Sequence, residues 1–200
     1  NGAGFDAESD ASFAVSSSNP GSLVFSTSSG ATFGTAGAAV PRVRVDQSIT
    51  LDEDAATDVL LDVNAPVNLG SNNFEFESDV ELDDDVNAGN GIFRALGTTI
   101  TAESDNSIDN LEVNTDTTDL KVRTDDPATP TSRTLTVDDE LTLTSGTLDH
   151  SINDVVVNGS GNSDNVAFTS GEVVATTGEL DLDVSSNTVT VTPTQNAGDT

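Results

Sequence analysis

The sequence predicts an all-β protein built as a β-solenoid, a stack of short strands wound coil upon coil. Apolar and polar residues alternate along most of the chain, which is the period of a half-buried strand. Clusters of Asn, Gly, Asp and Ser separate these runs, and one run pattern recurs further along the chain. A jelly-roll β-sandwich is the alternative fold.

The alternating runs follow one another with no segment of helical period between them. Each run directs one row of apolar side chains into a core, while Thr and Asp fill the outward row. The runs cover residues 43–45, 61–63, 67–69, 74–76, 111–113, 120–122, 135–137, 141–143, 180–184 and 189–191. Turns are expected between them, for example at 87–91 and 158–162, because Gly and Asn tolerate a positive φ.

An internal repeat favours the solenoid over the sandwich. The apolar pattern that begins at Leu61 begins again at Leu135, and a Ser ends both blocks. Divided among three coils, the separation of the two blocks predicts about 25 residues per coil, which lies in the range of solenoid repeats.

The composition excludes several classes of site. With no cysteine there is no disulfide, thiol nucleophile or cysteine-ligated zinc, and with His150 as the single histidine no site can use two imidazoles. The 35 acidic residues outnumber the 6 basic ones and give a net charge of −29. Such a chain repels nucleic acid and anionic membranes, so neither nucleic-acid binding nor membrane insertion is expected.

The charge balance indicates a saline, extracellular setting. An acidic surface with Lys121 as its single lysine stays hydrated where salt screens its self-repulsion. No apolar run approaches the length of a membrane span, and the numbered chain begins with Asn1 instead of Met. We therefore expect a processed protein that is secreted to the extracellular space or the cell surface.

Residues 1–35 differ from the solenoid body predicted at 36–200. The segment is rich in Ser, Gly and Ala, and it holds four of the eight phenylalanines, namely Phe5, Phe13, Phe25 and Phe33. A weakly charged, periodically apolar terminus can add as a donor strand to the open edge of a neighbouring copy. The alternative is that this segment forms the first coil or the cap of the same domain.

Three acidic triplets are the candidates for a metal site. Residues 52–54, 83–85 and 138–140 could gather oxygen ligands for Ca²⁺, but none fits a calcium-binding loop motif. Solvated acidic turns explain them better, so we predict no cofactor and at most loosely bound Ca²⁺.

No catalytic residue is predicted, and we expect no enzymatic activity. A sugar-cleaving site usually offers aromatic platforms, yet Trp and Tyr are absent. Lys121, Arg123 and Arg133 could act as the basic group of a polysaccharide lyase, although neutralising nearby carboxylates is their commoner role. His150 lies at an expected junction of strand and turn, and Asn158 begins the single glycosylation sequon.

Two stretches carry a family resemblance. Residues 133–149 followed by 154–159 resemble the β-strand repeats of large secreted surface proteins and autotransporter-like passengers. That resemblance implies a right-handed parallel β-helix. Residues 143–149 and 167–173 are similar to a strand of TasA-type biofilm fibre subunits, which are jelly rolls joined by donor-strand exchange. The chain lacks the Pro-Gly-Asp turn and the lysine-rich composition expected of that second family.

Taken together, these features predict a structural subunit of an extracellular filament or surface layer in a salt-adapted microbe. Copies of the chain would assemble with one another through β-strand contacts, and other cell-surface components are further candidate partners. The alternative function is an adhesin fragment that binds glycans or a partner cell along one long face.

Overall fold

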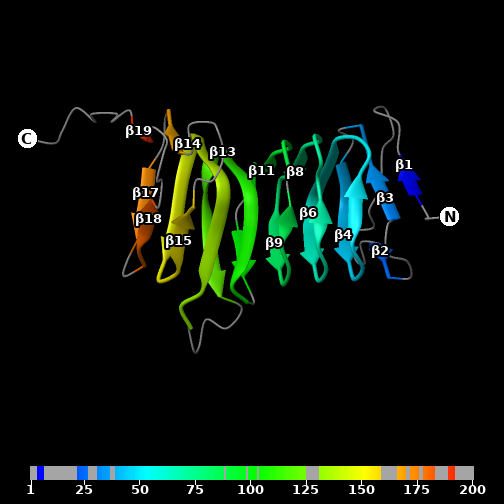
Figure 1. Ribbon diagram of the computed structural model, residues 1–200, viewed down its shortest axis with the longest axis horizontal. Coiled ribbons are helices and arrows are strands. Elements are labelled where there is room, and N and C mark those ends of the chain that lie inside the picture. Colours follow the sequence, from blue (N-terminus) through cyan, green and yellow to red (C-terminus); the bar gives the residue numbers. More distant parts are fainter. Residues whose placement is uncertain are drawn as a thin grey trace, which may run out of the picture.

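The computed structural model shows a single stack of strands whose long axis runs from the N-terminal to the C-terminal end of the chain (Figure 1). In the part of the chain that the structure describes, strands, turns and bends are present and no helix. The described residues are 4–6, 22–26, 31–36, 39–87, 89–97, 99–102, 104–124, 131–158, 166–169, 172–175, 178–182 and 189–191.

The described residues contain nineteen strands that form one sheet, and every pairing between these strands is parallel. The predicted β-solenoid is therefore confirmed. The jelly-roll alternative is wrong, because a jelly roll is built from antiparallel strands.

Each coil crosses three parallel ladders in a fixed order, which we call ladders 1, 2 and 3. Ladder 1 contains β1 (Gly4–Asp6), β3 (Ala31–Gly34), β5 (Ile49–Leu51), β7 (Val67–Asn68), β10 (Val86–Asn87), β15 (Asp154–Val157) and β18 (Leu180–Leu182). Ladder 2 contains β8 (Phe74–Phe76), β11 (Phe93–Ala95), β16 (Val166–Phe168) and β19 (Val189–Val191). Ladder 3 contains β2 (Leu23–Phe25), β9 (Asp79–Leu82), β12 (Thr99–Ala102) and β17 (Glu172–Ala175).

Four longer strands bend around corners and so contribute to more than one ladder. β4 (Ala39–Val45) and β6 (Ala55–Val63) pass from ladder 2 to ladder 3, and the buried Pro41 lies at the register shift where β4 turns. β13 (Asn106–Thr124) and β14 (Thr134–Ser151) each cross all three ladders.

Contacts between coils define the true coil length and correct the predicted repeat. The hydrogen bond that joins Asp54 to Asn73 across one coil has a sequence separation of 19, whereas the bond that joins Asp105 to Thr134 has a separation of 29. The coils are therefore unequal. The recurrence of the Leu61 pattern at Leu135 is not a structural period, because Leu61 lies on ladder 3 and Leu135 on ladder 1.

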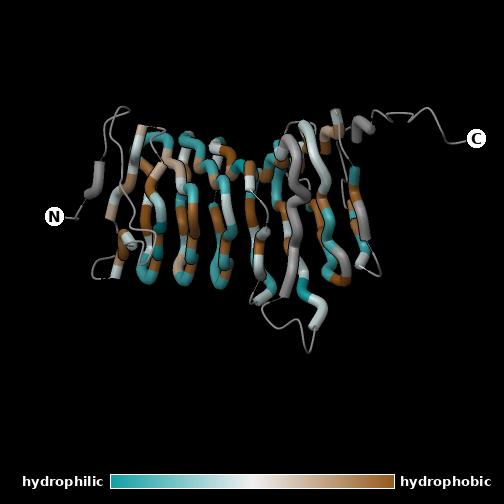
Figure 2. Tube along the Cα trace, turned by 180° about the vertical axis from the view of Figure 1, so that it is seen from behind, coloured by the Kyte–Doolittle hydropathy of each residue, from teal (hydrophilic) through white to brown (hydrophobic). Residues whose placement is uncertain are grey.

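The core is a column of apolar side chains that stack in register from coil to coil. Figure 2 shows brown apolar residues alternating with paler or teal ones along the strands. Phe33, Phe74, Phe76 and Phe93 are fully buried, and the ring centroids of Phe74 and Phe93 are 6.1 Å apart. Because the coils are stacked, each coil covers the apolar side chains of its neighbours. An isolated coil could not bury its own apolar row.

The corners hold the coils together through Asp and Asn side chains. Asp54 Oδ1 accepts a hydrogen bond from the backbone N–H of Asn73 at 2.7 Å, and Asn73 Oδ1 accepts one from Ile92 in the next coil at 3.2 Å. Glycine is required where the corners touch, because a Cβ at Gly91 would lie 2.0 Å from the carbonyl oxygen of Asn72.

The backbone hydrogen bonds give the stack a direction. N–H groups of inward-facing residues donate to the next coil, as from Phe74 to Ile92 (2.9 Å), and their carbonyls accept from the next coil, as Val63 does from Asp83 (2.8 Å). Outward-facing residues therefore bond to the preceding coil, as Glu77 does. At the N-terminal end of the stack the backbone groups that point away from the body therefore belong to outward-facing residues, and at the C-terminal end they belong to inward-facing residues.

The described parts of residues 1–35 pair with the coils that follow them. Phe5 in β1 is in register with Phe33, and Leu23–Phe25 pairs with β4. Phe33 and Phe25 lie in the core, with ring centroids 5.5 Å apart. Phe13 lies outside the described residues. The role of this segment as a strand shared between subunits stays a prediction.

Truncating a core ring should cost the stack much of its stability. We predict that Phe93→Ala lowers the free energy of unfolding by about 3–5 kcal/mol, because it removes transfer energy and leaves a cavity between Phe74 and Phe76. Urea denaturation measures the effect. Val24→Ala is the control, since Val24 is 45% exposed, and its midpoint should stay unchanged. Equal losses in both variants would contradict the stacked core.

Candidate functional site

The outward row of ladder 2 carries three neighbouring charged side chains. Glu75, Arg94 and Glu112 follow one another in register on β8, β11 and β13. Arg94 Nε donates to Glu112 Oε2 at 2.6 Å, and Arg94 Nη1 donates to Glu75 Oε1. One guanidinium thus joins three consecutive coils on the surface.

Partial burial makes this trio stronger than an ordinary surface ion pair. The Arg94 side chain is 25% exposed and that of Glu112 is 14% exposed. Burial by itself lowers the pKa of Arg94, but hydrogen bonds to Glu112 and Glu75 outweigh this effect and raise the pKa above its ordinary value. Arg94 therefore stays charged and holds two carboxylates that would otherwise repel each other.

A second ion pair on ladder 3 is more exposed. Arg44 Nε lies 2.7 Å from Asp46 and 3.6 Å from Asp62 of the next coil, and 51% of the Arg44 side chain is exposed. The hydrogen bond to Asp46, with the negative charges of Asp46 and Asp62, raises the pKa of Arg44. Water screens this pair, so it adds little to stability.

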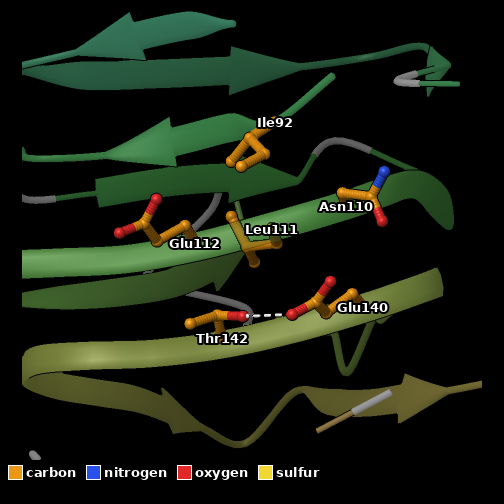
Figure 3. A pocket seen from close by; sticks show the side chains of 6 residues that line it. All are labelled: Ile92, Asn110, Leu111, Glu112, Glu140 and Thr142. Atoms are coloured by element: carbon orange, nitrogen blue, oxygen red, sulfur yellow. Dashed lines mark hydrogen bonds between the residues drawn. The ribbon is translucent and has the colours of Figure 1, made fainter. Parts of the chain in front are cut away.

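A pocket of about 260 Å³ adjoins the trio between β13 and β14 (Figure 3). It lies where the register shifts, because Ile108 pairs with Val137 but Asn110 pairs with Glu140, which leaves an extra residue on β14. The lining residues are Ile92, Asn110, Leu111, Glu112, Glu140 and Thr142.

The acids of this pocket already have hydrogen-bond partners. Glu140 Oε1 accepts from the Thr142 hydroxyl at 2.9 Å, and Glu112 Oε1 accepts from the Thr144 hydroxyl at 3.1 Å. In Figure 3 the carboxylates of Glu112 and Glu140 lie on different sides of Leu111. The lining offers two carboxylates, one hydroxyl and one amide as hydrogen-bonding groups. The arrangement can bind polar groups through these side chains.

The acidic triplets lie at corners, where several members bind backbone. Asp54 and Asp85 each accept an N–H of the next coil, the latter from Ser107 at 2.8 Å, and Asp138 accepts from the Asn158 side chain at 3.0 Å. Within the residues the structure describes, no group of three or more His, Cys, Asp or Glu is placed to hold a metal ion.

His150 is a buried corner residue. It is 1% exposed at the end of β14, and its Nδ1 lies 2.8 Å from the carbonyl oxygen of Asn153, whose own N–H donates to the His150 carbonyl. Gly178 of the next coil packs against this corner, since a Cβ there would lie 3.0 Å from Nδ1. The imidazole therefore fills and closes a turn.

The remaining candidates do not converge on one place. Lys121 and Arg123 belong to the ladder 3 part of β13, and their side chains lie outside the description. Arg133 precedes β14, where its backbone N–H donates to Asn153 at 3.1 Å. Asn158 follows β15, and its side-chain amide donates to Asp138, whereas the rest of the sequon lies outside the described residues.

Comparisons with known proteins add no relative. No family model, curated protein or solved structure matches the chain. Among the residues that the structure places, none belongs to a helix with the length and apolar character needed to cross a membrane.

Removing the Arg94 guanidinium should lower the stability of the stack, because it removes the contacts that join three coils. We predict that Arg94→Gln destabilises the protein by about 1–2 kcal/mol, because it leaves Glu75 and Glu112 adjacent and without their shared cation. Urea unfolding in low salt and in 1 M NaCl measures the loss, most of which should persist in high salt because the trio is partly buried.

The matched control is Arg44→Gln, which removes the exposed arginine of the other ion pair. Its unfolding midpoint should match that of the unmodified protein. If both variants lose the same stability, the Arg94 trio is no stronger than a screened surface pair.

Proposed function

We propose that this protein is a structural subunit of an extracellular filament or surface layer, secreted by a salt-adapted microbe and assembled through β-strand contacts between copies. The observation that carries the proposal is that the three parallel ladders run from one end of the stack to the other. Its outermost described strands, β1 and β2 at one end and β17, β18 and β19 at the other, each pair with one described strand.

Edge strands of this kind favour association. A strand with one neighbour presents a row of N–H and C=O groups that another strand can satisfy. The edges lie at opposite ends of a long molecule (Figure 1). Contacts that join unlike ends do not close into a ring when the axis is straight, so they grow a filament.

The charge balance explains why assembly would depend on salt. A net charge of −29 opposes contact between copies in dilute buffer. The Debye length falls from about 30 Å at 0.01 M to about 3 Å at 1 M ionic strength, which removes most of this repulsion. Loosely bound Ca²⁺ at the acidic corners would act in the same direction.

An adhesin fragment is the second candidate. The pocket beside Glu140 and Asn110 is the described feature that favours it, since amide and carboxylate groups can bind the hydroxyls of a glycan. Such a protein would bind its ligand as a monomer and would not need other copies.

Electron microscopy of the purified protein separates these functions. We predict single particles at 10 mM NaCl and filaments or sheets at 1–3 M NaCl, with light scattering following the same transition. CaCl₂ at millimolar concentration should lower the NaCl needed. A protein that stays monomeric throughout, and that sediments with a polysaccharide, would overturn the filament proposal in favour of the adhesin.

A further inference from the structure

We propose that copies of this chain join head to tail in one register, with β17 of one copy pairing in parallel with β2 of the next. This inference rests on the proposed function and adds the polarity and the register of the junction. It follows from the backbone, the burial and the charges of the two ends.

Backbone hydrogen bonding supplies the first argument. In the body, inward-facing residues bond to the following coil and outward-facing residues to the preceding one. On this rule the N–H and C=O of Val24 point away from β4 at the N-terminal end, and those of Val173, Leu180 and Leu182 point away from the body at the C-terminal end. Joining these two ends repeats the pairing found between every two coils. Joining like ends would reverse the strand direction at the junction.

Burial supplies the second argument. In the middle of the stack the inward residues of ladder 3, such as Leu61 and Val80, are fully buried. The apolar residues packed against the core but only partly buried all lie toward the ends: Leu23 on one side, and Phe168, Val173, Leu180 and Leu182 on the other. Among the described residues, Val24 is the single large hydrophobic residue classed as exposed. A second copy in register would cover the partly buried inward residues of both ends and would place a strand beside the outward-facing Val24.

Charge disfavours contact between two C-terminal ends. Residues 11–41 contain no charged side chain, whereas residues 155–200 contain acids and no Lys or Arg. Contact between two C-terminal ends would bring Glu172, Glu179 and Asp181 of one copy against their counterparts, and like charges on facing strands are destabilising. Contact between unlike ends places Glu172 of β17 against β2, which carries no charge, and leaves Asp6 of β1 as the acid of the described N-terminal strands that faces the C-terminal end.

Register fixes the partner of each strand. Val24 begins an outward row that the pairings carry along ladder 3 through Arg44, Asp62, Glu81, Thr101 and Arg123. Lys121 pairs with Asp149, so Ser151 is level with Arg123, and Ser151 pairs with Ala175 after a shift of one residue on β14. Neighbouring strands lie about 4.8 Å apart. Ala175 of one copy and Val24 of the next should therefore fall within disulfide range, which needs a Cα–Cα distance of about 4.4–6.8 Å.

Cysteine cross-linking tests the junction, because the chain has no cysteine of its own. Val24→Cys and Ala175→Cys are made singly, mixed at 1 M NaCl, oxidised and separated on non-reducing gels. We expect a cross-linked dimer in the mixture, little in either variant alone, and a ladder of multimers from the double variant. Val24→Cys mixed with Thr101→Cys is the matched control, since Thr101 lies in the same row inside the stack and should give no dimer.

The outcomes separate this inference from the function on which it rests. A dimer formed by Val24→Cys alone shows contact between like ends and overturns the polarity. Filaments by microscopy with no cross-link in any mixture overturn the register but leave the filament function standing. Monomers at every salt concentration overturn both. As a variant that avoids cysteine chemistry, Val24→Asp should raise the salt concentration needed for filaments, and unchanged assembly would count against the junction.

Discussion

The coil-to-coil hydrogen bond is the constraint on which the rest of this structure depends. A short strand such as β8 or β11 has no partner within its own coil, so each N–H and C=O must be satisfied by the coil before or after it. This requirement aligns the inward residues into continuous rows, and the rows become the core. It also gives the molecule a polarity that a sheet of alternating strand direction would lack.

The polar residues of the chain follow from the same constraint. At corners, where the ladder is interrupted, side chains such as Asp54 and Asn73 take over as acceptors for the next coil. On the faces, charges separated by one coil become neighbours, which is how Arg94 joins Glu75 and Glu112. Acidic side chains such as Asp54, Glu75 and Glu112 therefore have a structural role on the surface.

The sequence correctly predicted strands with one buried row, but it did not predict which residues of successive coils become neighbours, because that depends on the number of residues in each coil. The alternation around Leu61, Phe74 and Leu135 correctly predicted strands with one buried row, because a period of two is set by backbone geometry within a few residues. The repeat was misjudged because the coils are unequal, so equal spacing in sequence does not mean equal position in the stack. The Arg94 trio could have been found only by knowing that Glu75 and Glu112, at i − 19 and i + 18, lie one coil away on either side. The junction of strand and turn predicted at His150 is confirmed, but the sequence did not signal that the imidazole would be buried there.

Amide hydrogen exchange, compared between monomers in dilute buffer and assemblies in high salt, tests most directly whether the ladder continues from one copy to the next. We expect amides inside the stack, such as those of Val63 and Val80, to be protected in both states. The amides of Val24 and Leu182 should exchange quickly in the monomer and become protected on assembly. If filaments form while both of these end amides continue to exchange as quickly as before, the copies are joined by some surface other than the ends of the ladder.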